Sequence, residues 1–330
     1  RQMIEEELLD YARIDLCIVG GLTEARKIAG WCETHNIKIV PHNPLGPVCA
    51  SACLHLDLDS AWAAAAVPDC AYLDVTQWGP PLRFTTSTRL IESFYAEIKD
   101  RSAPFTLFGS GDFHHLAALW LRRVAEPFTL VSFDNHPDWD VRPPRWACGG
   151  WINRALELPH LKAAHVWGLG NFELHWPNRL FACHGALRNR RLEVHPWAER
   201  LPARDQSRWP TVTRENWRDG FRQFAGALAG ETVYVTVDLD CLSGAEAVTN
   251  WENGLFTAAD VAWAIAQLRA NARMVGGDVC GAYSPPRYAR WKQRLTARFD
   301  HPALPPVDCG EAQRRNIAAL GQIWPVLTGA

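Results

Sequence analysis

Short apolar runs alternate along most of this chain with longer stretches in which apolar residues recur every three or four positions. The short runs are typical of buried strands, and the longer pattern is typical of helices with one buried face. The runs predict strands at residues 15–19, 37–40, 70–74, 105–108, 128–133, 165–169, 192–194, 233–237 and 274–279. The longer stretches predict helices at 23–34, from about 48, and at 87–99, 114–123, 149–156, 214–228, 257–270 and 310–327.

This alternation predicts an α/β fold, because strands separated by helices pair in parallel and are covered by helices on both faces. A new start near residues 54–59 follows a proline-rich loop. It divides the chain into an N-terminal βαβα fragment, residues 1–53, and a larger domain, residues 54–330. Residues 200–212 contain two prolines and are expected to form a surface loop.

The composition limits which binding partners and which cellular compartment we expect. The net charge is −2, so neither a nucleic acid nor an anionic membrane is expected as a partner, and no run of 18 apolar residues could span a bilayer. Ten cysteines occur without a Cys-x-x-Cys pair, which is typical of reduced thiols in a cytoplasmic protein. The acidic N-terminus begins with Arg1 and has no signal-peptide pattern, so we expect a chain that is processed, trimmed or incomplete there. The expected partner is a small molecule. The sequence is also compatible with a homo-oligomer.

Two predicted strands end in acidic motifs that carry the candidate chemistry. The strand at 128–133 runs into Asp134, His136 and Asp138, and the strand at 233–237 runs into Asp238 and Asp240. Side chains two positions apart point to the same side of an extended chain, at the edge where open α/β sheets place their ligands. Single aspartates are usually caps or turn formers. Clustered carboxylates would repel one another, and two divalent cations would neutralise the four aspartates.

The larger domain resembles the ureohydrolase family, which includes arginase, agmatinase and formiminoglutamase, and more distantly the metal-dependent deacetylases. The resemblance rests on residues 111–115 (GDFHH), 134–138 (DNHPD), 236–240 (TVDLD), 253–257 (NGLFT) and 275–279 (VGGDV), the last followed by 284–286 (SPP). It implies a three-layer arginase-like fold with a central parallel sheet and two divalent metal ions, with manganese as the family's metal. It implies that one ion is held by His114, Asp134, Asp138 and Asp238, and the other by Asp134, His136, Asp238 and Asp240.

The adjacent pair His114 and His115 leaves two readings open. Counting from Gly111 makes His114 the metal ligand and places His115 behind it. The pair also resembles the tandem histidines of deacetylases, in which one histidine is a general base. We therefore take Asp138 as the candidate that orients an attacking water, and His115 as the candidate for proton transfer.

The predicted substrate pocket departs from the family pattern. Cys148 stands where the guanidine hydrolases carry a histidine, and Gly281 stands where they carry a guanidinium-binding glutamate. A buried guanidinium without a carboxylate partner costs several kcal/mol, so arginine and agmatine are not the expected substrates. Residues 243–244, Ser-Gly, also replace the Asp-Pro of the family. The candidate pocket residues are Cys148, Trp151, Asn153, Trp251 and Gly281.

Residues of about 13–53 resemble the last part of an enolase-superfamily barrel of the sugar-acid dehydratase kind. The matching text is residues 19–29 (VGGLTEARKIA) and 40–47 (VPHNPLGP). Two strands cannot close an eight-stranded barrel, so this segment is expected to have no activity of its own. His42 is expected to be an ordinary loop histidine.

These observations predict a binuclear, manganese-dependent hydrolase of a non-peptide C–N bond. A deacetylase-like amide hydrolase is one alternative. A metal-binding but inactive binding or regulatory module is another, because the two positions that grip the substrate have changed. A third interpretation is that the chain is an artificial or accidental fusion. In that case the first 53 residues carry no information about function.

Overall fold

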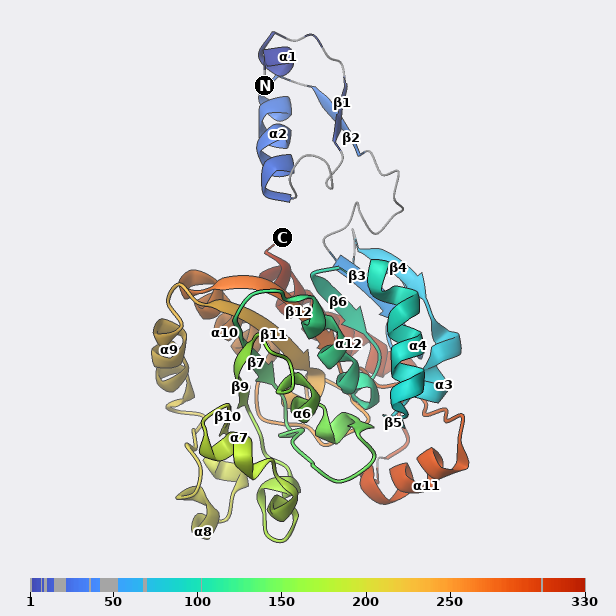
Figure 1. The fold of residues 1–330 in the computed structure, drawn as a ribbon, viewed down its shortest axis with the longest axis vertical. Helices are drawn as coiled ribbons and strands as arrows, with labels where there is room; N and C mark the ends of the chain where they lie inside the picture. The colour runs from blue at the N-terminus through green and yellow to red at the C-terminus, as the bar shows by residue number, and fades with distance from the viewer. Residues whose placement is uncertain are drawn as a thin grey trace.

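The computed structural model describes residues 2–6, 8, 11–14, 22–35, 37–41, 53–67, 70–101, 103–303 and 305–329. Most of these residues belong to one α/β unit built on an eight-stranded sheet, shown in Figure 1. Among the described helices, none combines the length and apolar character that a bilayer crossing requires.

The large sheet is parallel throughout. From one edge to the other its strands are β10 (Leu192–His195), β9 (Leu161–Trp167), β7 (Phe128–Phe133), β11 (Thr232–Asp238), β12 (Arg273–Cys280), β6 (Phe105–Phe108), β3 (Cys53–Asp57) and β4 (Ala71–Asp74). Because all strands run the same way, their carboxyl ends meet at one edge of the sheet.

Helices cover both faces of this sheet, and alternate strand residues enter two separate cores. Leu130 belongs to one core and its neighbour Val131 to the other, as the period of two along a strand requires. The first core packs under α4 (Thr88–Ile98), α5 (Ala117–Trp120) and α6 (Ile152–Ala155). The second packs under α9 (Trp217–Ala227), α10 (Ala258–Asn271) and α12 (Cys309–Thr328). The predicted three-layer α/β fold with a central parallel sheet is confirmed.

Shorter elements complete the large unit. They are α3 (Gly79–Leu82), α7 (His184–Arg188), α8 (Ala203–Gln206), α11 (Trp291–Asp300), and the antiparallel pair of β5 (Thr85–Thr86) with β8 (Trp146–Ala147). The β5–β8 pair fixes the start of the loop that carries Cys148, whose amide donates to the carbonyl of Phe84.

The N-terminal segment has its own small sheet and core. It contains α1 (Gln2–Glu5), β1 (Tyr11–Ile14), α2 (Leu22–Thr34) and β2 (Lys38–Pro41), and β1 pairs in parallel with β2. Its buried residues form a cluster separate from the two large cores: Ile4, Ala12, Ala25, Cys32 and Ile37. Within the described part of the chain, β1 and β2 make no pairing with the large sheet.

Most predicted elements lie where the pattern placed them, and the exceptions have physical causes. The strand predicted at 165–169 begins earlier than expected, because β9 begins at Leu161 and ends at Trp167. The helix predicted at 114–123 is instead the 3₁₀ helix η4 (Gly111–Leu116), then α5 and another 3₁₀ turn. The predicted loop at 200–212 contains α8. The predicted strand at 15–19, the helix from about 48, and His42 lie outside the described residues.

We expect a chain that begins at residue 53 to fold without the preceding segment, because the two large cores contain no residue of the N-terminal cluster. The main thermal transition should shift by less than the roughly 2–4 °C that corresponds to about 1 kcal/mol in a domain of this size. Calorimetry of both chains measures this shift. Loss of the cooperative transition in the shortened chain would contradict the expectation.

Candidate metal centre

Three neighbouring strands end at the same level and bring the candidate site together. The register pairs Phe133 of β7 with Val237 of β11, so Asp134 and Asp238 follow side by side. On the other side of β11, Asp238 pairs directly with Cys280, the last residue of β12. Asp240 follows in the 3₁₀ turn η10 (Leu239–Cys241). All four aspartates of the two motifs are at least 95% buried.

His114 reaches this edge from η4, which follows β6. Its Nδ1 atom lies 3.1 Å from Oδ2 of Asp134, 3.3 Å from Oδ2 of Asp138 and 3.5 Å from Oδ2 of Asp238. This buried Nδ1 atom has no hydrogen-bond partner. One imidazole nitrogen therefore faces three carboxylates at the separations that a shared cation would bridge.

A hydrogen-bond chain behind His114 fixes which ring nitrogen faces the carboxylates. The Thr236 hydroxyl donates to Oδ1 of Asp278 over 2.6 Å, so it accepts from the Nε2–H of His114, 2.9 Å away. The Tyr234 hydroxyl donates to the other Asp278 oxygen over 2.8 Å. Because the proton of the neutral ring is held on Nε2, the lone pair on Nδ1 points into the site.

His136 forms a second donor group that shares Asp134 with the first. Its Nδ1 atom lies 2.8 Å from Oδ2 of Asp240 and 3.6 Å from Oδ1 of Asp134. Its Nε2 atom lies 3.5 Å from the Glu252 carboxylate, which orients the ring from behind. The donor atoms of Asp134, His136 and Asp240 all lie within 4.8 Å of one another, as do those of His114, Asp134 and Asp138.

Backbone amides and a tryptophan hold the carboxylates in these positions. The amide of His136 donates to Asp134, and the amide of Asn135 donates to Oδ1 of Asp240. The indole Nε1–H of Trp151 donates to Oδ2 of Asp138. Asp138 has a φ of 48°, in the left-handed region that non-glycine residues rarely adopt. Backbone strain of this kind is concentrated at functional sites.

The electrostatics of the site show how poorly the clustered carboxylates tolerate ionisation. Burial, and then the neighbouring Asp134, raise the pKa of Asp138 to about 7. Burial and the carboxylate neighbours also raise the pKa values of Asp238 and Asp240. Burial alone would lower the pKa of His114, but the facing carboxylates raise it well above its ordinary value. Positive charge is therefore strongly favoured at this edge of the sheet.

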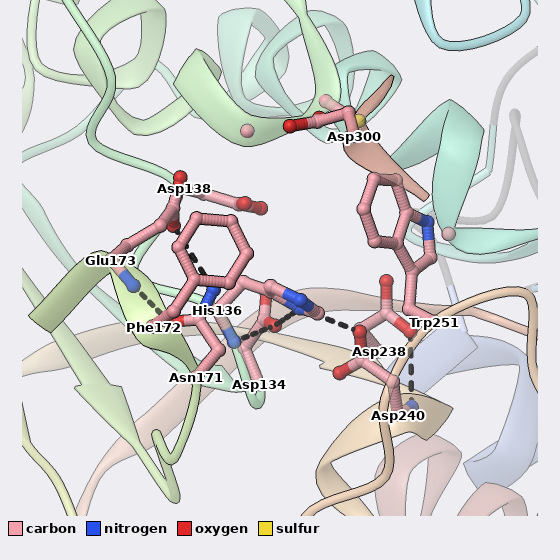
Figure 2. A pocket seen from close by; sticks show the side chains of 13 residues that line it. Asp134, His136, Asp138, Asn171, Phe172, Glu173, Asp238, Asp240, Trp251 and Asp300 are labelled. Atoms are coloured by element: carbon pink, nitrogen blue, oxygen red, sulfur yellow. Dashed lines mark hydrogen bonds and ion pairs between the residues drawn. The ribbon is translucent and has the colours of Figure 1, made fainter. Parts of the chain in front are cut away.

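A cavity that is open to solvent adjoins these side chains. Figure 2 shows Asp134, His136, Asp238 and Asp240 grouped in it, with Phe172 and Trp251 on opposite sides. The lining residues are Gly111, Asp134, His136, Asp138, Cys148, Gly149, Asn171, Phe172, Glu173, Asp238, Asp240, Trp251 and Asp300. Of the predicted pocket residues, Cys148 and Trp251 line the cavity.

Besides His114, which faces the carboxylates without lining the cavity, four predicted site residues do not line it. His115 is fully buried and is not among the lining residues, and burial lowers its pKa to about 3. Trp151 lies behind Asp138 instead of facing a substrate. The amide nitrogen of Asn153 donates to the carbonyls of Trp139 and Asp140 and so holds their loop.

Gly281 is the fourth of these residues, and its backbone explains why no side chain stands there. Its φ is 102°, and a Cβ atom would lie 2.1 Å from Oδ1 of Asp238. A glutamate at this position would therefore collide with a carboxylate of the site. The backbone at position 281 therefore excludes the family's guanidinium partner.

Sequence reasoning missed Glu173, Asp300, Asn171 and Phe172. Asn171, Phe172 and Glu173 lie at the start of the 3₁₀ helix η7 (Phe172–Leu174), in the loop that follows β9. The rule that ligands collect at the carboxyl ends of parallel strands could have indicated this loop. Burial raises the pKa of Glu173 to about 8. Asp300 ends α11, which no pattern indicated.

Another group of side chains that could bind a metal lies on β9 and β10, but its imidazole rings pack against aromatic rings. It consists of His165, Glu193 and His195. The His195 ring stacks on Trp167 with centroids 3.8 Å apart, and burial lowers the pKa of His165 to about 4 and that of His195 to about 3. Only one carboxylate is present, so no cation is needed to relieve charge repulsion there.

Solved structures with the same fold come from enzymes. Proclavaminate amidino hydrolase from Streptomyces clavuligerus aligns with 85% of this chain and 93% of its own, with a TM-score of 0.51 and 13% identity. Formimidoylglutamase from Bacillus subtilis aligns with 84% of this chain and 87% of its own, with a TM-score of 0.50 and 12% identity. At these identities the likeness shows the fold alone.

Comparisons of the sequence identify different proteins. A family model described as enolase C-terminal domain-like matches residues 1–101, although β3 and β4 within that range pair in the large sheet. An uncharacterized protein of Thermotoga maritima is 26% identical over 196 residues, 59% of this chain and 64% of its own length. D-galactonate dehydratase of Verminephrobacter eiseniae is 32% identical over 135 residues, 40% of this chain and 30% of its own length. The alignments thus span less than two thirds of either relative. The chain joins a ureohydrolase fold to an N-terminal segment similar to the enolase C-terminal domain.

Proposed function

We propose that this chain is a binuclear metal-dependent hydrolase that cleaves a non-peptide C–N bond in a small molecule. The observation that carries the proposal is the pair of donor groups that share Asp134. Each group presents one imidazole Nδ1 to carboxylates, and the Nδ1 of His114 has no hydrogen-bond partner. The residues therefore fit two divalent cations, with Asp134 and Asp238 bridging as the family resemblance implies.

The donor chemistry is compatible with manganese, the ion that the resemblance implies, because carboxylate and imidazole ligands suit it. Four buried aspartates are balanced by two divalent cations. When bound, such a pair activates water and stabilises negative charge that develops on the substrate.

Residues around the proposed metal ions would orient the attacking water and give a proton to the departing amine. Asp138, which accepts a hydrogen bond from the Trp151 indole, would orient the attacking water. Glu173 lines the same cavity, and burial raises its pKa to about 8, which favours the protonated carboxyl group in the metal-free protein. A carboxylic acid in this state is suited to protonate a departing amine. Glu173 thus replaces His115 as our candidate for proton transfer.

The cavity favours a compact substrate other than arginine or agmatine. No carboxylate can occupy position 281, so the family's guanidinium partner is absent. Trp251 and Phe172 provide aromatic walls, and Asp300 adds one carboxyl group that is neither a proposed metal ligand nor the proposed proton donor. The described lining contains no lysine or arginine. A neutral or cationic C–N compound therefore suits the cavity better than an anion.

A second candidate function is a metal-binding module without catalysis. It is favoured by the changes at two positions that matter for substrates in the family, Cys148 and Gly281. This candidate shares the metal centre and differs only in turnover.

Turnover of a panel of ureido, guanidino and N-acyl compounds with added Mn²⁺ separates the two candidates. We expect at least one member to be hydrolysed, with arginine and agmatine among the poorest substrates. Glu173→Gln should lower kcat by about 10²–10⁴-fold, the usual contribution of a general acid, while both metals stay bound. No turnover of any compound by the metal-loaded protein would leave the inactive module as the answer.

The hydrogen bond that holds the proton of His114 on Nε2 can be tested separately. Thr236→Val keeps the shape of the side chain but removes the acceptor for Nε2–H, so metal affinity should fall by about 10–100-fold. Tyr234→Phe is the matched control, because Tyr234 contacts the other Asp278 oxygen and leaves the link through Thr236 intact. Unchanged metal affinity in Thr236→Val, measured by titration calorimetry, would contradict this role.

The stability of the metal-free protein should fall as pH rises from about 5.5 to about 8.5. A carboxyl group whose folded pKa is raised loses stability as it ionises, up to about pH 7 for Asp138 and about pH 8 for Glu173. The raised pKa values of His114 and His136 act in the same direction, because their protonated forms are stabilised by the folded state. Saturating Mn²⁺ should remove the part of this loss that comes from the proposed ligands, since metal ions compete with protons there. Thermal unfolding measures both effects, and a metal-free protein that is more stable at the higher pH would refute them.

A further inference from the structure

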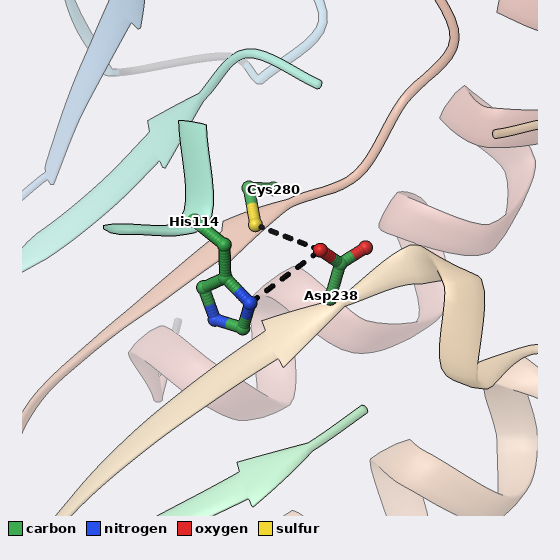
Figure 3. A group of neighbouring side chains, drawn as sticks. All are labelled: His114, Asp238 and Cys280. Atoms are coloured by element: carbon green, nitrogen blue, oxygen red, sulfur yellow. Dashed lines mark hydrogen bonds and ion pairs between the residues drawn. The ribbon is translucent and has the colours of Figure 1, made fainter. Parts of the chain in front are cut away.

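Cys280 belongs to the same sheet edge as the proposed metal ligands. It is the last residue of β12, directly beside Asp238 in the register of β11 and β12. Its side chain is fully buried, and Sγ lies 3.5 Å from Oδ2 of Asp238. In Figure 3 the sulfur and the His114 ring both point toward the same oxygen of Asp238.

The three donors have the separations that a small cation imposes. His114 Nδ1 and Cys280 Sγ each lie 3.5 Å from Oδ2 of Asp238, and all three donor atoms lie within 4.8 Å of one another. Donor atoms around a tetrahedral zinc are about 3.5 Å apart, which follows from Zn–S near 2.3 Å and Zn–N near 2.0–2.1 Å. The buried Nδ1 of His114 faces the carboxylates around it without forming a hydrogen bond of good geometry, so a ligand fits among these donors.

We propose that the thiolate of Cys280 is a metal ligand alongside His114 and Asp238, and that it makes this half of the centre prefer a thiophilic divalent ion, such as Zn²⁺ or Co²⁺, over Mn²⁺. Thiolates select softer ions, whereas carboxylates suit manganese. The other half of the centre, around His136 and Asp240, has only carboxylate and imidazole donors. This proposal rests on the metal centre proposed above and refines which ions it takes.

Binding at sulfur requires loss of one proton. The Cys280 thiol releases its proton to solvent as the cation binds, and the sulfur lone pair forms the bond to the ion, so no oxidation or reduction is involved. The competing interpretation is that the thiol only donates a hydrogen bond to Asp238. Serine distinguishes the two, because it keeps a donor beside Asp238 but lacks the soft sulfur.

Cobalt substitution tests the proposal in the full-length protein. Metal-free protein is titrated with Co²⁺, and the bound metal is counted while the near-ultraviolet thiolate-to-cobalt charge-transfer band is recorded. We expect the band in the wild type, its loss in Cys280→Ser, and its retention in Cys148→Ser. Cys148 is the matched control, because this second cysteine lines the cavity but belongs to none of the donor groups. Competition between Zn²⁺ and Mn²⁺ should show a preference for zinc that falls on the order of 10–100-fold in Cys280→Ser.

X-ray absorption of the zinc-loaded wild type keeps the test independent of the folding of any variant. A sulfur neighbour of zinc at about 2.3 Å is expected. Metal binding with no sulfur neighbour, no charge-transfer band, or a band that is lost in Cys148→Ser instead would overturn the role of Cys280 and leave the metal-dependent hydrolase standing. Failure to bind any Co²⁺ or Zn²⁺ would overturn both.

Discussion

The mutual repulsion of four buried aspartates is the constraint on which this site depends. Asp134, Asp138, Asp238 and Asp240 are brought to one edge of the sheet by backbone pairing, and the register leaves them no way to separate. The raised pKa values of three of them measure the cost of that arrangement. Protonation of the carboxyl groups, two protonated histidines or bound metal ions can relieve this repulsion. Only metal ions would also be coordinated by the carboxylate oxygens and imidazole nitrogens that point inward.

The residues behind the carboxylates show that the cluster is organised for ligation. The chain Tyr234–Asp278–Thr236 orients the His114 ring, and Glu252 lies behind His136. Such outer contacts fix the tautomers of metal-binding histidines. A second buried network, in which Arg83 pairs with Asp112 and Asp59, anchors the loop just before His114. The position of His114 thus depends on charges outside the cavity as well as inside it.

Patterns along the sequence predicted the sheet and the acidic motifs, because both are local. Strand alternation and strand-end aspartates can be identified without knowing any tertiary contact, and Asp134 and Asp238 do meet as adjacent strand ends must. The pocket was harder, since its walls come from loops whose course depends on packing. Trp151 and Asn153 follow Cys148 in the chain but turn to support Asp138 and the 139–140 loop. Glu173 and Asp300 come from distant segments, and the collision at Gly281 is visible only with Asp238 in place.

The ureohydrolase fold supplies the edge of the sheet, and we propose that Cys148, Cys280 and Gly281 influence which metals and substrates this chain accepts. Diffraction from crystals soaked in Mn²⁺, with anomalous scattering to locate the ions, tests the central claim most directly. The account requires two anomalous peaks about 3.5–4 Å apart, one on the His114 side of Asp134 and one on the His136 side. Full soaking with no peak beside Asp134, or a peak only at the separate His165 group, would contradict it.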